Sequence, residues 1–179
     1  MAAQFQGKIS DSIDVAWARL ASRAVRVALT RRDVSYAQLA DELTKLGLSE
    51  SARSVEGKVQ RGTFRFTFFL QALMASHGEY PEHWSRALSD ESPWEVRAAA
   101  LMKGELALHP WLDWGKLSRR LGEIGVNLPP EALATQIDDG MFSAALFFQC
   151  AAVCRFNGTQ LFLDASDLNE AALVGASAA

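Results

Sequence analysis

The feature that most constrains the fold of this chain is a stretch of 40 residues that occurs twice, 78 positions apart. Residues 36–75 align with residues 114–153 without a gap, and 7 of the 40 pairs are identical. Apolar residues also face apolar residues at further pairs, so the property that repeats is the burial pattern. The identical pairs are Leu39/Leu117, Leu43/Leu121, Gly47/Gly125, Gly62/Gly140, Phe64/Phe142, Phe69/Phe147 and Gln71/Gln149. We therefore expect two copies of one small fold.

The first copy is expected to form three short helices. Ser35 and Gln38 make a capping box, so a helix starts there and ends at Gly47. A second helix covers about residues 51–61 and stops at Gly62. The third helix is apolar, and residues spaced three and four apart would close a small core: Phe66, Phe69, Leu70 and Leu73.

The second copy carries the same signals. Asp113 caps its first helix, Pro129 and Pro130 occupy the first turn of its second helix, and Gly140 ends that helix. Its apolar third helix is expected to bury Leu146, Phe147, Cys150 and Ala151.

A longer helix is expected before each copy. The first covers residues 11–31, after a loose tail over residues 1–10. The second starts with Ser92 as the cap, Pro93 in the first turn and a glutamate that completes the capping box. Trp94 occupies the position of Trp17 at a shift of 77. The predicted fold is thus all-α, with two four-helix units in a pseudo-two-fold arrangement.

These signals divide the chain into a first repeat, a connector, a second repeat and a C-terminal extension: residues 1–80, 81–92, 93–158 and 159–179. The connector is expected to hold a short helical turn over residues 82–88. After Asn157-Gly158 we expect an extended segment. Ser166 or Asp167 then caps a last short helix that ends near Val174, before a disordered tail.

The first copy resembles the phage-repressor-like helix-turn-helix domain. The residues that carry this resemblance are Tyr36-Ala37-Gln38-Leu39-Ala40, Gly47-Leu48-Ser49, Val55, Val59 and Arg61-Gly62. With the Arg-Gly-x-Phe segment and the run Phe68 to Gln71, the chain looks still more like a small bacterial domain family of unassigned function, here in tandem. The resemblance implies a helix-turn-helix-like fold for each repeat.

Charge is distributed unevenly along the chain. Residues 1–88 contain 12 Lys+Arg and 9 Asp+Glu, whereas residues 89–179 contain 6 and 12. A basic half attracts phosphate and an acidic half repels it. If the protein contacts nucleic acid, the first half is therefore the better candidate.

Composition is that of an ordinary globular protein, with 49% hydrophobic and 22% charged residues. No run approaches the roughly 20 apolar residues of a membrane span, and the first ten residues lack the apolar core of a signal peptide. We therefore expect a cytoplasmic protein without a membrane partner. Cys150 and Cys154 lie one helical turn apart, so we expect two reduced, buried thiols and no metal.

Catalytic motifs are absent from the sequence. It has no phosphate-cradling glycine loop, no nucleophile elbow and no set of zinc ligands. Asp138 and Asp139 are adjacent and would point about 100° apart on a helix, which suits a polar helix end better than acid/base chemistry. His77, Glu79 and His83 lack the spacing of a helical ligand pair and are expected at the surface. We predict no enzyme activity, no cofactor and no metal.

The second helix of copy one is the candidate DNA reader. Arg53 and Gln60 are placed to read base edges, while Lys58, Arg61 and Arg65 are placed to hold phosphate. The full predicted set is Arg31, Arg32, Arg53, Ser54, Gly57, Lys58, Gln60, Arg61 and Arg65. The matching helix of copy two, over residues 130–139, contains no basic residue and is not expected to bind DNA.

Two functions follow from these features. The first is a transcriptional regulator in which copy one reads duplex DNA and copy two pairs with copy one or with another chain, as in a homodimer. The second is a protein–protein interaction or scaffold module that keeps the helix-turn-helix fold without nucleic-acid affinity, because fold alone does not determine function.

Overall fold

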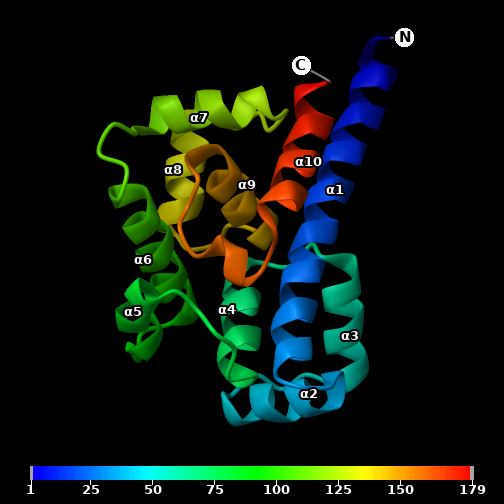
Figure 1. The fold of residues 1–179 in the computed structure, drawn as a ribbon, viewed down its shortest axis with the longest axis vertical. Coiled ribbons are helices and arrows are strands. Elements are labelled where there is room, and N and C mark those ends of the chain that lie inside the picture. Colours follow the sequence, from blue (N-terminus) through cyan, green and yellow to red (C-terminus); the bar gives the residue numbers. More distant parts are fainter. Residues whose placement is uncertain (1, 178–179) are drawn as a thin grey trace.

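The computed structural model describes residues 2–177, and this part of the chain is all-α, as predicted (Figure 1). No helix described there is long and apolar enough to cross a lipid bilayer. Its α-helices and two 3-10 helices (η) follow in the order α1 (Ala2–Arg31), α2 (Tyr36–Lys45), α3 (Ala52–Arg61), α4 (Phe66–Ala75), η1 (Glu82–Trp84), α5 (Ser85–Ser89), α6 (Trp94–Ala107), α7 (Trp114–Glu123), α8 (Pro130–Asp138), α9 (Ala144–Cys154), η2 (Thr159–Leu161) and α10 (Ala165–Ala176).

Local capping sets the ends of the short helices, as the sequence predicts. The Oγ of Ser35 accepts a hydrogen bond from the Gln38 amide at 3.2 Å, and the Gln38 side chain accepts one from the Ser35 amide at 2.8 Å. This capping box starts α2. Asp113 caps α7 in the same way through the Lys116 amide, at 2.8 Å. Pro130 is the first residue of α8, where the missing amide proton is not needed.

The two copies share a close helix contact that only glycine permits. Gly62 and Gly140 end α3 and α8 with φ angles of 69° and 66°. A Cβ on Gly62 would lie 1.8 Å from the Ala18 carbonyl oxygen, and one on Gly140 would lie 1.9 Å from that of Glu95. Ala18 and Glu95 are 77 positions apart, the shift that relates the two tryptophans. The end of each second helix therefore rests on the backbone of the helix that precedes its copy.

Each helix that precedes a copy packs against both copies. α1 packs against α9 of copy two, and α6 packs against α4 of copy one. α1 also contacts α3 and α4, and α6 also contacts α8. Each long helix thus covers the apolar helix of the other copy, and the buried residues join into one hydrophobic core. The copies are interlocked in space, although they are consecutive in the sequence.

A short backbone pairing joins the copies where α4 and α9 begin. The Phe66 amide donates to the Phe142 carbonyl and the Ala144 amide donates to the Phe64 carbonyl, each at 3.0 Å. Both bonds surround an antiparallel bridge between Arg65 and Ser143, which are counterparts at the shift of 78. Each copy therefore gives the other the same bond that it receives.

Aromatic rings fill the core behind this pairing. Phe66 stacks on Phe147 with ring centroids 4.2 Å apart. Trp84 from the connector meets Phe147 edge-on and stacks on Phe162 from the C-terminal extension. All of these rings are buried. The connector and the extension therefore contribute to the core and are not mere links.

The predicted loose tail at the N-terminus is wrong for the residues that the structure describes. α1 already begins at Ala2, and only Met1 lies outside the described range. The added turns lie beside α10 (Figure 1). Just after these turns, in the part of α1 that the sequence predicts, Ile13 is buried against Gly125 of copy two. A long-range contact of this kind leaves no signal in the local sequence.

The start of α6 also differs from the prediction. Its N-cap is Pro93, without a side-chain cap, because the Ser92 hydroxyl donates to Asp90 Oδ1 at 2.8 Å instead. Trp94 is the first residue of α6 and is only half-buried, whereas Trp17 lies inside α1 and is fully buried. The two tryptophans thus match in sequence but not in environment.

The C-terminal extension is more ordered than predicted. Gly158 adopts a φ of 89° and is followed by η2, where an extended segment was expected. α10 has Asp164 at its N-cap, not Ser166 or Asp167, and it continues through Gly175 to Ala176. A Cβ on Gly175 would lie 1.7 Å from a carbonyl oxygen of copy two, so this glycine allows close packing. The end of the predicted tail, residues 178–179, lies outside the described residues.

The shared glycine contact leads to a stability prediction. Gly62→Ala is expected to lower the free energy of unfolding by about 2–5 kcal/mol, because the positive φ costs about 1–2 kcal/mol and the backbone clash about 1–3 kcal/mol more. Gly140→Ala should cost a similar amount. Gly47→Ala is the matched control: its φ is 84°, but its Cβ would meet no atom within 4 Å. In urea unfolding, the free energy of unfolding of Gly47→Ala should fall only by the cost of the positive φ. Equal losses at Gly62 and Gly47 would contradict the packing described.

Candidate nucleic-acid interface

α3 presents the face that the sequence predicts. Val55 and Val59 are buried against the core, while Arg53, Gln60 and Arg61 are exposed on the opposite side. The Ser51 side chain starts the helix by accepting a hydrogen bond from the Ser54 amide at 3.1 Å. The polar side of α3 is therefore open to a large partner.

Three of the predicted phosphate ligands surround one depression, which we call the basic hollow. Lys58, Arg61 and Arg65 line it, at the end of α3 and the start of α4, and its volume is about 360 Å³. Thr67 lies in its wall, is largely buried, and makes no side-chain hydrogen bond to another described residue. Three cations and an unused hydroxyl at one concave surface are suited to an anionic oxygen group.

Acidic neighbours already engage part of the predicted set. Glu50 forms an ion pair with Lys58 and accepts a hydrogen bond from the Ser54 hydroxyl at 3.1 Å. Gln60 donates to Glu56 at 3.1 Å. Arg53 forms no ion pair with another described residue. A nucleic acid would therefore meet Arg53 directly, whereas it would have to displace Glu50 from Lys58.

Gly57 has a local reason in the structure. A Cβ at this position would lie 3.2 Å from Nη1 of Arg61, so the glycine leaves room for the guanidinium to fold back over α3. The sequence suggests that a backbone or a ligand approaches Gly57. The group that does approach it is a side chain of the same helix.

Arg31 and Arg32 lie apart from the basic hollow. They are at the C-terminal end of α1, and the Arg31 guanidinium donates to the Leu161 carbonyl. Gly62, beside the hollow, rests on Ala18, which is about 20 Å away along α1 at 1.5 Å per residue. The two arginines do not join the cluster that Lys58, Arg61 and Arg65 form.

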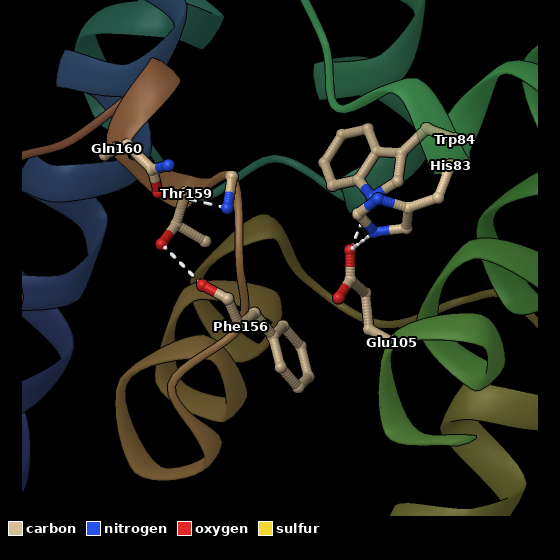
Figure 2. A network of polar contacts seen from close by, with 7 residues as sticks. His83, Trp84, Glu105, Phe156, Thr159 and Gln160 are labelled. Carbon is tan, nitrogen blue, oxygen red and sulfur yellow. Dashed lines mark hydrogen bonds and ion pairs between the residues drawn. The ribbon is translucent and has the colours of Figure 1, made fainter. Parts of the chain in front are cut away.

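A buried polar network escaped the sequence analysis (Figure 2). Glu105 on α6 is only 1% exposed, and its Oε1 accepts a hydrogen bond from Trp84 Nε1 at 2.6 Å. His83 is exposed, as predicted, and its Nε2 lies 2.6 Å from the same oxygen. The Oε2 atom is buried without a partner. The signal in the sequence is the spacing of Glu105 from Ala98, which places it on the apolar stripe of α6.

The two cysteines behave as predicted. Both are free and buried. Burial raises the pKa of the Cys150 thiol well above its usual range and raises the pKa of Cys154 to about 11. Because the thiolate is the reactive form, neither side chain is suited to nucleophilic chemistry at neutral pH. Among the described residues, no group of three or more His, Cys, Asp or Glu is arranged to hold a metal ion.

A family comparison matches both copies. The model of a domain of unknown function, DUF6471, matches residues 17–79 and again residues 94–158. The chain belongs to the DUF6471 family. The two matches begin at Trp17 and Trp94, so the family domain includes the long helix before each copy. No curated protein and no solved structure matches the chain.

The buried carboxyl group leads to a second stability prediction. His83→Ala should lower the free energy of unfolding by about 1–3 kcal/mol, because Glu105 then keeps one hydrogen-bond donor in a buried site. Glu105→Gln in the same background should recover part of the loss, since a neutral amide is easier to bury than a carboxylate.

Glu82→Ala, at the exposed position beside His83, is the control and should change stability by no more than about 0.5 kcal/mol. Urea unfolding of the three variants and the parent measures these effects. If His83→Ala leaves the free energy of unfolding unchanged, the histidine does not stabilise the buried Glu105.

Proposed function

We propose that this protein is a DNA-binding regulator in which α3 lies against duplex DNA and the basic hollow holds a backbone phosphate. The observation that carries the proposal is the convergence of Lys58, Arg61 and Arg65 on one open surface beside the exposed face of α3. This surface lies in the half of the chain that carries the positive charge excess. Charge concentrated in this way binds phosphate without regard to base sequence.

In this proposal, the exposed residues of α3 recognise the bases. Arg53 is exposed and unpaired, so its guanidinium is free to donate two hydrogen bonds to a guanine edge. Gln60 is exposed as well, but it exchanges its bond to Glu56 for one to a base. The ion pair of Lys58 with Glu50 is replaced by a phosphate when DNA binds. The acidic partner then keeps the unbound surface from attracting anions indiscriminately.

Copy two has a structural part in this proposal. Its α8 ends at Asp138, is followed directly by Asp139 and has no basic residue, so this end of the helix repels phosphate. Its α9 instead supports α1, on which the end of α3 rests. We infer an approximate two-fold relation between the copies, supported by the reciprocal bonds at Arg65 and Ser143. Cytoplasmic residence is part of the same proposal.

A protein-interaction role is the alternative, and one observation favours it. Leu46 is 44% exposed, whereas its counterpart Ile124 is 7% exposed because α10 covers it. Copy one therefore shows an apolar surface at the position where copy two carries a helix. A partner protein, or a second copy of this chain in a homodimer, is the occupant in this alternative.

The DNA-binding proposal predicts two kinds of variant. Arg53→Ala should lower the discrimination between sequences by about 1–3 kcal/mol, because it removes a contact to a base edge. Lys58→Ala and Arg61→Ala should weaken binding to all duplexes alike and lower the salt slope by about one, because each removes a phosphate contact. Fluorescence anisotropy with labelled duplexes at several salt concentrations measures both effects.

The matched control lies in copy two. Replacing Asp138 and Asp139 by lysine should add non-specific affinity at most, because α8 has no side chain equipped to read a base. Absence of duplex binding by the unmodified protein at about 50 mM salt, where phosphate contacts are strongest, would reject the proposal in favour of the protein-interaction role.

A further inference from the structure

A second cavity occupies the position in copy two that the basic hollow occupies in copy one. It has a volume of about 500 Å³ and lies between α1, the turn after α3, and α8 and α9. Three of its residues are the counterparts of residues that line the basic hollow. Gln136, Ser143 and Gln149 correspond to Lys58, Arg65 and Gln71. We call it the neutral cavity, because glutamine and serine stand in it where copy one has lysine and arginine.

Two polar side chains in the wall of the neutral cavity make no hydrogen bond to another described residue. Trp17 is fully buried, and its indole Nε1 has no partner in the described part of the chain. Gln149 is 6% exposed, and its amide makes no hydrogen bond to another described residue. A buried polar group without a hydrogen bond costs about 1–3 kcal/mol. The buried Trp17 Nε1 bears this cost, whereas the Gln149 amide stays accessible from the cavity and can bind a ligand there.

The charge of the wall restricts the ligand. None of the described residues that line the neutral cavity is Lys, Arg or His, and Asp14 contributes a carboxylate at its exposed side. A phosphate or a carboxylate would therefore meet only repulsion there. The ligand must be uncharged or cationic, in contrast to the anion that suits the basic hollow.

The hydrogen-bonding groups restrict it further. The Trp17 ring lies in the wall, but its Nε1 is buried and offers the ligand no donor. The Gln149 amide offers one acceptor and one donor side by side, a pattern that pairs with an adjacent donor and acceptor on a planar ring or amide. Apolar side chains, among them Val126 and Leu146, complete the wall and suit the face of such a ring.

We propose that the neutral cavity binds a small uncharged planar heterocycle that carries an adjacent hydrogen-bond donor and acceptor, the chemistry of a nucleobase or of nicotinamide. Its volume lies within the usual range for small-molecule sites, about 300–1,000 Å³. Gln149 pairs with the donor and acceptor, and the Trp17 ring forms part of the wall, so its indole signal senses a ligand without bonding to it. This inference does not depend on DNA binding, because none of these residues belongs to the basic hollow.

The indole N–H signals of the five tryptophans report on this site directly in ¹⁵N-labelled protein. Trp17→Phe assigns the relevant signal. Adenine, adenosine and nicotinamide are the probes, each added up to millimolar concentration, and adenosine monophosphate tests the exclusion of anions. At least one neutral probe should move the Trp17 signal to saturation, and the phosphorylated probe should bind at least about tenfold more weakly than adenosine.

Gln149→Leu should weaken binding of that probe by about tenfold or more, whereas Gln71→Leu, the same change at the counterpart in copy one, should leave it unaltered. Thermal unfolding verifies that each variant is folded, and Gln136→Leu serves in place of Gln149→Leu if that variant is not. No response of the Trp17 signal to any neutral probe would overturn the proposal. Equal effects of Gln149→Leu and Gln71→Leu would overturn it too.

Discussion

The contact on which the rest of this structure depends is the pairing of the two copies at Arg65 and Ser143. Two reciprocal backbone hydrogen bonds fix the start of α4 against the start of α9, and the Phe66 and Phe147 rings stack directly behind them. The backbone amides and carbonyls before each apolar helix form their hydrogen bonds with the other copy. They therefore need no partner within their own copy. α1 and α6, which each contact both copies, then close a single core.

This arrangement explains how one duplicated sequence supplies two different surfaces. The same backbone positions at the junction form a hollow in each copy, and the side chains decide its character. Lysine and arginine in copy one make the basic hollow, while Gln136 and Ser143 in copy two make the neutral cavity. α10 lies against α1 and against α9 of copy two, and Gly175 and Ile13 approach Gly125. The extension outside the repeats thus makes the two surfaces unequal.

Most of the fold can be predicted from the sequence, because local signals determine most helix ends. The capping box at Ser35 and the positive φ of Gly62 both follow from residue type and position. What the sequence does not reveal depends on contacts between distant segments. The Ser92 hydroxyl donates a hydrogen bond to the Asp90 side chain instead of capping α6, the role predicted for it. Gly175 is helical because it packs on copy two, although its neighbours are typical of a loose tail.

The candidate site divides in the same way. The outward face of α3 follows from helical periodicity, so the exposure of Arg53 and Arg61 is predictable. The engagement of Lys58 by Glu50 and the isolation of Arg31 depend on three-dimensional placement. The buried Glu105 and the unpaired Trp17 indole follow no known motif, since their importance lies in what surrounds them.

The central claim is that the two hollows have diverged, so that only the one in copy one meets nucleic acid. The most direct test follows the backbone amide signals of both hollows while a short DNA duplex is added at low salt. The account predicts shifts at Arg65 and Thr67, with Ser143 and Ala145, their counterparts, left in place. Equal shifts in the two hollows, or shifts confined to copy two, would contradict it.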